Sequence, residues 1–340
     1  MNVQEPRSAI LTRPPGGALE PADDRGTGRD QPAIDSSPIV GLSPWQIAWR
    51  SFRRDRLAVS GLIFIAILVV VALSAPLIAR YVVHHGPNDL YVRQTISANG
   101  LPSGPSGDFW FGVDTAGRDV FVRVLYGART SLIVAFAATG ASVLLGVAIG
   151  LIAGFSRGLV DGALSRLMDF VLSLPALLLS LGLVSACGLR QQGCLFGLIR
   201  PGIMLVSLVI ALFSWPYLGR IVRGQVLSLR QREFVEAAIA LGSPPSRIAF
   251  REILPNVVAP IIVYTTLLIP NNILFEASLS FLGLGVPPST PSWGQMLAQA
   301  SSIFTVAWWM MLFPGLFLFF TTFAFNIVGD GLRDALSGRR

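Results

Sequence analysis

The sequence of 340 residues contains no lysine, so all 26 of its basic residues are arginine. A phosphate-binding loop of the form Gly-x-x-x-x-Gly-Lys-Ser/Thr needs its lysine to reach the nucleotide phosphates. The chain therefore cannot bind and hydrolyse ATP through such a loop. The exclusive use of arginine points to codon usage in a GC-rich genome rather than to a chemical requirement.

Charged residues are also scarce, at 13% of the chain, whereas 52% of residues are hydrophobic and the mean hydropathy is +0.63. A soluble domain of this length cannot bury so much apolar surface, which favours a membrane protein. The formal net charge of +7 does not indicate nucleic-acid binding, because the arginines lie between the apolar runs. Arginines placed in this way anchor a protein at the cytoplasmic face of a membrane.

Six apolar runs approach the 20 or so residues that a helix needs to cross the hydrocarbon core. The sequence therefore predicts an all-α integral membrane protein with six transmembrane helices, four of which contain a proline that would kink them. In the second run, Gly146, Gly150 and Gly154 recur every four residues and would let another helix approach closely. The predicted spans are 57–79, 130–155, 166–187, 201–222, 257–281 and 306–328, and the prolines are Pro175, Pro216, Pro270 and Pro314.

Arginine placement predicts the orientation of these spans. With the N-terminus inside, 19 of the 26 arginines fall on the inner side, which favours two cytoplasmic termini. Residues 1–42 are predicted to be a disordered cytoplasmic tail without a signal peptide, and residues 331–340 a cytoplasmic C-terminal tail. Residues 43–56 are predicted to form an interfacial amphipathic helix on the inner leaflet; contact of this helix with a neighbouring subunit is the alternative.

Few polar residues suggest chemistry. His84 and His85 are adjacent, so they point apart and make a poor metal site. Cys187 and Cys194 flank a short outer loop and would form a disulfide if that side is oxidising; two cysteines exclude a cysteine metal cluster.

The predicted extracytoplasmic loop, residues 80–129, contains Gly117, Arg118 and Asp119. No nucleophile or second carboxylate has a defined spacing to this triplet, so Arg118 and Asp119 are expected to fix a turn. Residues 119–127 could form a short amphipathic helix that leads into the second span.

Two acids lie in or near the spans, where an ionisable group is a functional candidate. Asp169 lies three residues from Arg166 and could pair with it. Glu276 would lie at the outer interface or form hydrogen bonds within the bundle.

The inner loop, residues 224–256, contains four arginines and is predicted to form a compact knob within the core of residues 130–330. Its first helix, Arg230 to Leu241, has one apolar face, and acids lie near its start, where they suit the helix dipole. Gly242 would end this helix, a second short helix would follow Ser243, and Pro255 would mark the turn into the fifth span. The apolar face consists of Phe234, Ala237, Ala238 and Leu241, and the acids are Glu233 and Glu236.

This loop resembles that of the inner-membrane permease subunits of bacterial ABC importers, whose signature is Glu-Ala-Ala, three residues, Gly, and a later Leu-Pro. The corresponding residues here are Glu236, Ala237, Ala238, Gly242, Leu254 and Pro255. Further segments resemble the C-type subunit of the dipeptide/oligopeptide/nickel permeases, over residues 43–338. They are Gly117–Val120, Tyr126–Leu132, Glu276–Gly285 with Gly283, Pro291–Gly294 with Trp293, and Asn326–Leu336 with Asp330.

The resemblance implies a type I importer permease fold with coupling helices in the inner loop, in the bacterial inner membrane. It implies a second homologous permease, two ABC ATPase subunits that carry the ATP and magnesium, and an extracytoplasmic substrate-binding protein. The chain itself would be no enzyme and would bind no cofactor. Di- or oligopeptides are the expected substrates, with nickel, haem or glutathione as alternatives; a stand-alone secondary transporter or channel is the competing class.

Overall fold

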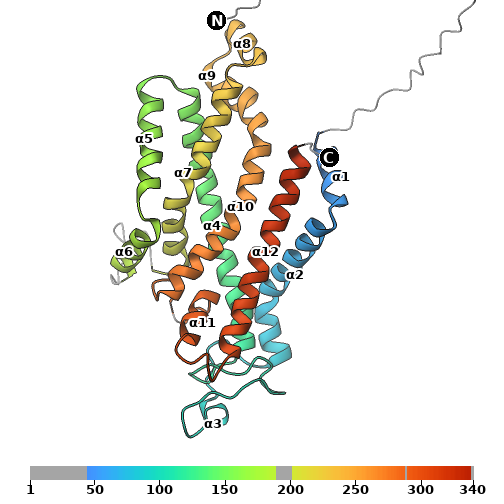
Figure 1. The fold of residues 1–340 in the computed structure, drawn as a ribbon, viewed down its shortest axis with the longest axis vertical. Helices are drawn as coiled ribbons and strands as arrows, with labels where there is room; N and C mark the ends of the chain where they lie inside the picture. The colour runs from blue at the N-terminus through green and yellow to red at the C-terminus, as the bar shows by residue number, and fades with distance from the viewer. Residues whose placement is uncertain (1–43, 189–200, 288, 338–340) are drawn as a thin grey trace, which may run out of the picture. The chain divides into compact units, whose positions relative to one another are not determined.

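The computed structural model describes residues 44–188, 201–287 and 289–337. The predicted tail of residues 1–42 and Cys194 lie outside these ranges. Within them the regular secondary structure is helical, with two isolated bridges in the loop before residue 120, which confirms the all-α prediction. The helices are α1 (Pro44–Arg54), α2 (Arg56–Ile78), η1 (Ala79–Val83), α3 (Val92–Thr95), α4 (Val120–Phe155), α5 (Leu159–Ser173), α6 (Ala176–Gly188), α7 (Ile203–Leu229), α8 (Glu233–Ala240), α9 (Pro245–Arg247), η2 (Ile248–Ile253), α10 (Leu254–Phe281), α11 (Trp293–Ala300) and α12 (Trp309–Ser337) (Figure 1).

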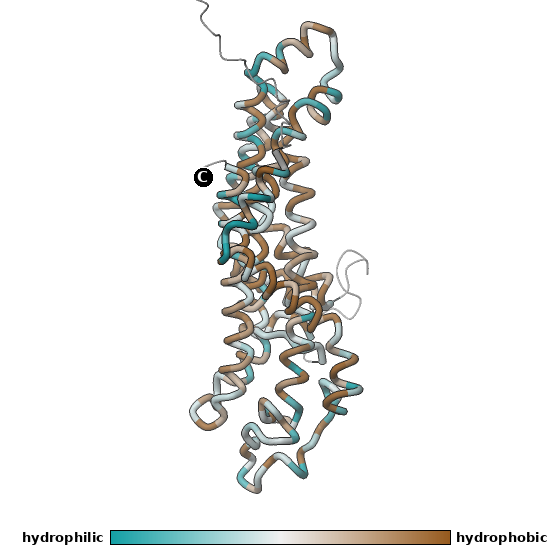
Figure 2. The backbone as a smooth tube through the Cα atoms, turned by 90° about the vertical axis from the view of Figure 1, so that its right-hand side faces the viewer, coloured by the Kyte–Doolittle hydropathy of each residue, from teal (hydrophilic) through white to brown (hydrophobic). Residues whose placement is uncertain are grey.

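Five helical stretches among the described residues are long and apolar enough to cross a membrane, and α5 with α6 could supply a sixth span. The five stretches are Arg56–Val83, Val120–Phe155, Ile203–Leu229, Pro245–Phe281 and Trp309–Ser337. Hydrophobic residues follow the helices through the middle of the bundle, whereas hydrophilic residues gather toward their ends (Figure 2). This distribution fits a bundle that spans a bilayer.

The third predicted span is broken, not merely kinked. Its two halves, α5 and α6, bend by 85° where Leu174 and Pro175 separate them. Leu174 has φ −76° and ψ 141°, an extended conformation. A proline disfavours the helical conformation of the residue before it and cannot donate its own backbone hydrogen bond, which explains the break.

Several predicted bounds are also wrong. Helix α4 begins at Val120, so the end of the predicted 80–129 loop is helical and residues 119–127 form no separate helix. No turn occurs at Pro255, because α9, η2 and α10 continue as one helical stretch from Pro245 to Phe281. Pro255 lies in the first turn of α10, where its missing N–H costs little. Helix α12 runs to Ser337, through most of the predicted C-terminal tail.

The glycine series of α4 packs directly against α7. A Cβ on Gly146, Gly150 or Gly154 would lie within 3.0 Å of α7 atoms. For Gly150 the nearest atom is the carbonyl oxygen of Gly219, at 2.5 Å. The small-residue spacing read from the sequence therefore marks a close contact between two helices of the bundle.

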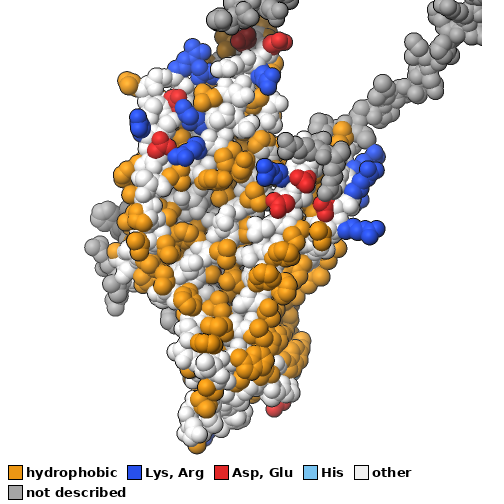
Figure 3. All heavy atoms as spheres, viewed as in Figure 1, with side chains coloured by type: hydrophobic (Ala, Val, Ile, Leu, Met, Phe, Trp, Pro, Cys, Tyr) orange, Lys and Arg blue, Asp and Glu red, His pale blue; other side chains and the backbone are white. Residues whose placement is uncertain are grey.

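A second contact joins α1, α2 and α12. Ala48 and Phe52 of α1, Ala58 of α2 and Ala335 of α12 are buried together. Arginine and acidic side chains gather at this end of the bundle and around α8 and α9, whereas the rest of the face in Figure 3 is largely hydrophobic. The α8 loop and the α1–α12 contact therefore lie toward the same polar end, opposite α3 (Figure 1).

Candidate functional site

Helix α8 contacts the bundle through Val235 and the half-buried Ala238. Val235 is the only buried residue of this helix, and it packs in a cluster with Val226 of α7 and with Ile248 and Ile253 of η2. The remaining side chains of α8 are exposed or partly exposed. The helix is therefore anchored along one edge and presents its other side outward.

The predicted docking face lies on that outward side. Phe234 is 40% exposed and Leu241 is 85% exposed, and Ala237 is exposed between them, while Ala238 is half-buried. Glu233 and Glu236 are exposed in the first turn, where their charge suits the helix dipole. Leu254 and Pro255 lie apart from this face, at the start of α10. We call Phe234, Ala237 and Leu241 the coupling face, after the role that the sequence predicts for these residues; apolar side chains exposed together are a feature of interaction surfaces.

Gly242 ends α8 as the sequence predicts. Its φ of 73° is left-handed, its N–H donates to Ile239 O at 2.9 Å, and the Ser243 N–H donates to Ala238 O at 3.0 Å. These two bonds form a Schellman motif, which strongly favours glycine at this position. A Cβ on Gly242 would meet no atom within 4 Å, so this position is constrained only by its backbone.

Arg230, just before α8, ties the loop to α4. Its Nη1 donates to the carbonyl oxygens of Gly154, Phe155 and Ser156 at 3.4, 3.2 and 3.2 Å. These carbonyls belong to the end of α4, where an arginine both satisfies free acceptors and suits the helix dipole. Arg230 therefore joins the start of the α8 loop to the end of α4 as well as to α7.

Two ion pairs join α5 to α7 near the same end. Arg223 donates to Asp161 through Nε at 2.6 Å and through Nη2 at 2.9 Å. Arg220 Nη2 lies 2.5 Å from Asp169 Oδ1, so the predicted partner of Asp169, Arg166, is wrong. Helix α5 packs along α7, which places the arginines of α7 closer than a residue one turn away on α5 itself.

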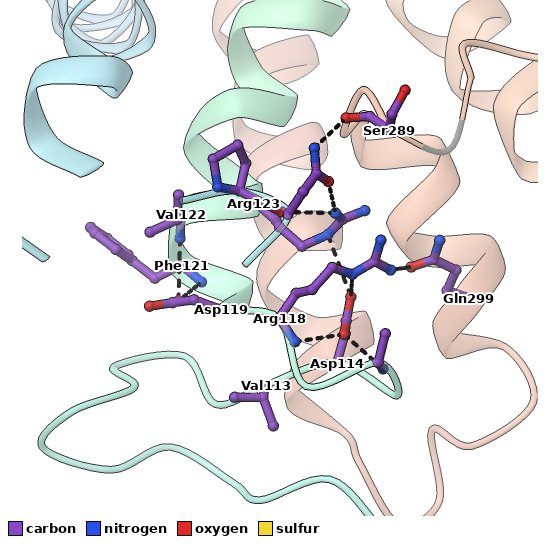
Figure 4. Close-up of polar contacts among 12 residues, drawn as sticks. Val113, Asp114, Arg118, Asp119, Phe121, Val122, Arg123, Ser289 and Gln299 are labelled. Atoms are coloured by element: carbon purple, nitrogen blue, oxygen red, sulfur yellow. Dashed lines mark hydrogen bonds and ion pairs between the residues drawn. The ribbon is translucent and has the colours of Figure 1, made fainter. Parts of the chain in front are cut away.

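At the opposite end, Arg118 and Asp119 fix a turn, as expected. Asp119 caps α4 by accepting from the N–H groups of Phe121 and Val122 at 2.8 and 3.3 Å. Arg118 Nε donates to Asp114 Oδ2 at 2.7 Å, and Gly117 adopts a left-handed φ of 76° between them (Figure 4). The triplet thus starts α4.

Arg123, which the sequence reasoning did not single out, is fully buried beside this turn. Its Nε lies 3.5 Å from Asp114 Oδ2, and its Nη1 donates to Pro87 O at 3.1 Å and Asn88 Oδ1 at 3.3 Å. Asn88 in turn donates to Ser289 O at 2.9 Å, which links the loop to the segment after α10 (Figure 4). An arginine within an apolar helix is a signal that could have found it.

His85, which the sequence analysis set aside as one of two adjacent histidines, also has defined contacts at this end of the bundle. Its Nδ1 lies 2.7 Å from Asp119 Oδ2, and its ring contacts Tyr91 and Phe109 at centroid distances of 4.7 and 4.9 Å. Burial, followed by the nearby Asp89 and Asp119 carboxylates, raises the pKa of Tyr91. Among the described residues, no group of His, Cys, Asp and Glu has the arrangement of a metal site.

Glu276 lies inside the bundle rather than at its surface. It is fully buried on α10 and accepts hydrogen bonds from Ser131 Oγ of α4 at 2.9 Å and from Ser280 Oγ at 2.7 Å. Gly283, with a φ of 81°, follows the end of α10. Trp293 is buried and donates through Nε1 to Val124 O at 3.1 Å. These residues join α4, α10 and α11.

The other residues of the predicted set are dispersed. Asn326 and Asp330 are exposed on α12. Cys187 is buried at the end of α6, and its predicted pairing partner, Cys194, is outside the described part of the chain. A polar chain that the sequence did not indicate lies at mid-bundle: Asn272 donates to Thr139 Oγ1 and accepts from Ser214 Oγ, both at 2.9 Å.

Comparison with known proteins gives a consistent family. The model of the family described as binding-protein-dependent transport system inner membrane component matches residues 146–340. The model of the N-terminal TM domain of oligopeptide transport permease C matches residues 43–98. The two matches together take in both the α8 loop and α1.

Curated relatives match most of the chain. The dipeptide transport system permease protein DppC of Alkalihalophilus pseudofirmus is 40% identical over 297 residues, 87% of this chain and 90% of the relative. The oligopeptide transport system permease protein OppC of Bacillus subtilis is 38% identical over 295 residues, with coverage of 87% and 90%. The glutathione transport system permease protein GsiD of Escherichia coli is 38% identical over 316 residues, with coverage of 91% and 96%.

A solved structure, an inward-facing conformation of the MetNI methionine ABC transporter, matches with a TM-score of 0.52 and 17% sequence identity, covering 64% of this chain and 96% of the matched chain. At this identity the match concerns the fold alone, and it agrees with the predicted type I permease fold. The chain belongs to the family of binding-protein-dependent transport system inner membrane components.

Proposed function

We propose that this chain is the permease subunit of an ABC importer of di- or oligopeptides and forms half of the translocation pathway. ATPase subunits would dock on the coupling face of α8 and move the bundle through it. The observation that carries this proposal is the exposed apolar face of Phe234, Ala237 and Leu241, on a helix fixed by Val235 and by Arg230. The printed functions of the dipeptide and oligopeptide permease relatives support the substrate class.

The α8 end of the bundle is proposed to be cytoplasmic, with both termini on that side. The arginine distribution of the sequence supports this orientation. Arg230, Arg232, Arg247 and Arg251 surround the α8–α9 loop, and Arg53 and Arg54 end α1. A surface on which soluble ATPases dock must lie on the cytoplasmic side, which agrees with this orientation.

The partners in this proposal are two ATPase subunits, a second homologous permease and an extracytoplasmic substrate-binding protein. The lack of lysine, and hence of a lysine-bearing phosphate loop, supports placing ATP and magnesium on other chains. The second permease would complete the pathway, and lipid would cover the remaining apolar helix surface. The chain would take no part in covalent chemistry.

A matched pair of variants tests the coupling face. Leu241→Asp places a charge on the face, whereas Leu159→Asp places the same charge on α5 at a leucine that is 91% exposed. In proteoliposomes of the purified transporter, Leu241→Asp should lower both peptide-stimulated ATP hydrolysis and dipeptide uptake at least tenfold, which corresponds to about 1.4 kcal/mol of docking free energy. Equal activity of the two variants would contradict the proposal.

The composition of the complex tests the class of transporter. A mild-detergent pull-down of the tagged chain from its native membrane should retain a second permease and two ATPases that contain phosphate loops. A chain that purifies alone as a homogeneous oligomer would instead indicate a stand-alone secondary transporter or channel.

Glutathione is a second candidate substrate, because the relative named for glutathione transport matches 91% of this chain at 38% identity. Competition for uptake distinguishes glutathione from dipeptides as the substrate. Excess glutathione that abolishes uptake of labelled dipeptide, while other dipeptides do not, would transfer the assignment to glutathione.

A further inference from the structure

An apolar groove lies where α1, α2 and α12 meet. Its volume is about 260 Å³, and all of its lining side chains are apolar. Its floor includes the buried Ala48 and Phe52 of α1, while Trp49 and Leu62 at its edges are 50% and 37% exposed. The α12 wall consists of Val328, Leu332 and Leu336, which are spaced by four residues and share one face. The groove is therefore open to its surroundings, and its side-chain lining is apolar.

The edge of the groove formed by α1 is strongly basic. The guanidinium of Arg53 lies 4.9 Å from the ring centroid of Trp49, which places the charge directly beside the groove. Arg50 and Arg54 are exposed on the same helix. None of these three arginines forms an ion pair with a residue that the structure describes.

The nearby acids of α12 do not neutralise this edge. Asp330 lies two residues from both Val328 and Leu332. Asp334 lies two residues from both Leu332 and Leu336. Two residues correspond to about 200° around an α-helix, so both carboxylates lie on the side of α12 away from the groove. The groove thus combines an apolar interior with a positive edge.

We propose that this groove binds an anionic glycerophospholipid of the inner leaflet. One acyl chain would lie along α12 between Trp49 and Leu62, and the headgroup phosphate would contact Arg53 and Arg50. Basic pockets between helices on the cytoplasmic side are suited to anionic headgroups, and an interfacial tryptophan lies at the level of the headgroups. The proposal goes beyond peptide transport, and it takes the α1 end as cytoplasmic, as in the proposed function.

The depth of the groove agrees with this occupant. Leu62 lies six residues beyond Arg56, the first residue of α2, which is about 9 Å along the helix. Val328 and Leu336 are separated by eight residues, or about 12 Å. The groove therefore extends from the level of the arginines into the hydrocarbon, as a phospholipid does.

Native mass spectrometry of the purified full-length chain, with the subunits that accompany it, tests the proposal. Phosphatidylglycerol and phosphatidylcholine with identical acyl chains are titrated onto the wild-type protein, Arg53→Gln, Arg157→Gln and Leu332→Trp. Arg157 is an exposed arginine between α4 and α5 and controls for loss of one positive charge. Leu332→Trp fills the groove without changing the charge.

The wild-type protein should retain phosphatidylglycerol more tightly than phosphatidylcholine. Arg53→Gln should weaken phosphatidylglycerol binding about fivefold, the contribution of one basic residue near a membrane surface, whereas Arg157→Gln should leave it unchanged. Leu332→Trp should weaken the binding of both lipids. The proposal is overturned by equal retention of the two lipids, by equal effects of the two arginine variants, or by no retained lipid, the last of which would mean that another occupant fills the groove.

Discussion

Gly150 of α4 faces Gly219 of α7 so closely that a Cβ on Gly150 would lie 2.5 Å from the carbonyl oxygen of Gly219. The contact involves backbone atoms of a neighbouring helix, so no side-chain rotation can relieve it. Gly146 and Gly154 meet α7 at comparable distances. The α4–α7 pair therefore depends on glycine at three successive turns.

The first prediction concerns this contact. Gly150→Leu should separate α4 from α7 and lower stability by about 1–3 kcal/mol, the usual cost of overpacking. Gly140→Leu is the control on the same helix, because a Cβ there would meet no atom within 4 Å. Thermal unfolding in detergent compares the two variants, and equal melting temperatures would show that α4 and α7 do not pack as described.

A second prediction concerns the buried arginine at the start of α4. Asp114→Asn should remove the carboxylate that faces Arg123 Nε and leave a buried charge without its counter-ion. Loss of one member of a buried ion pair costs about 3–5 kcal/mol. Folded yield and melting temperature after detergent extraction measure the loss.

Two further variants test that explanation. Asp108→Asn removes an exposed carboxylate from the same loop and should have little effect. The double variant Asp114→Asn with Arg123→Met removes the buried charge too and should recover part of the lost stability. A double variant no more stable than Asp114→Asn alone would mean that the loss comes from the turn bonds of Asp114 and its ion pair with Arg118, not from the buried charge of Arg123.

The third prediction concerns Glu276, which holds α4 to α10. Glu276→Leu removes the acceptor of two buried serine hydroxyls, and each unsatisfied group costs about 1–3 kcal/mol. Glu276→Gln should be milder, because the amide oxygen accepts from one serine and its NH₂ group can donate to the other. Melting temperatures in the order wild type, Gln, Leu are expected; a Leu variant as stable as wild type would contradict the role.

Long apolar runs made the helices predictable, because a bilayer demands about 20 apolar residues regardless of tertiary detail. Local spacing was also sufficient for Gly242, since a helix end depends on a few neighbouring residues. The break at Pro175 was not predictable in the same way. Pro216 and Pro270 lie inside continuous helices, so the presence of a proline does not by itself predict a break.

Contacts between distant segments were beyond the reach of sequence patterns. His85 meets Asp119 across 34 positions, and Asn272 meets Thr139 across 133. The partner of Asp169 was wrong for the same reason, because Arg166 is near in sequence whereas Arg220 is near in space. Sequence spacing describes one helix at a time, and these contacts depend on which helices are neighbours.

The last prediction separates two effects of a substitution at Gly242: the size of the new side chain, and the strain of placing a non-glycine residue in a left-handed conformation. Gly242 has a left-handed φ of 73° and open space around its Cα, so Gly242→Ala and Gly242→Trp share the backbone cost, whereas only the indole projects beside the coupling face. Both variants should keep the bundle folded, since the glycine lies beyond the anchor at Val235. If ATPases dock on this face, Gly242→Trp should abolish uptake of labelled dipeptide while basal ATP hydrolysis, without peptide stimulation, continues, and Gly242→Ala should retain most of the transport. Uptake at the wild-type rate in Gly242→Trp would refute docking at this face, and equal loss in both variants would assign the effect to the Schellman motif itself.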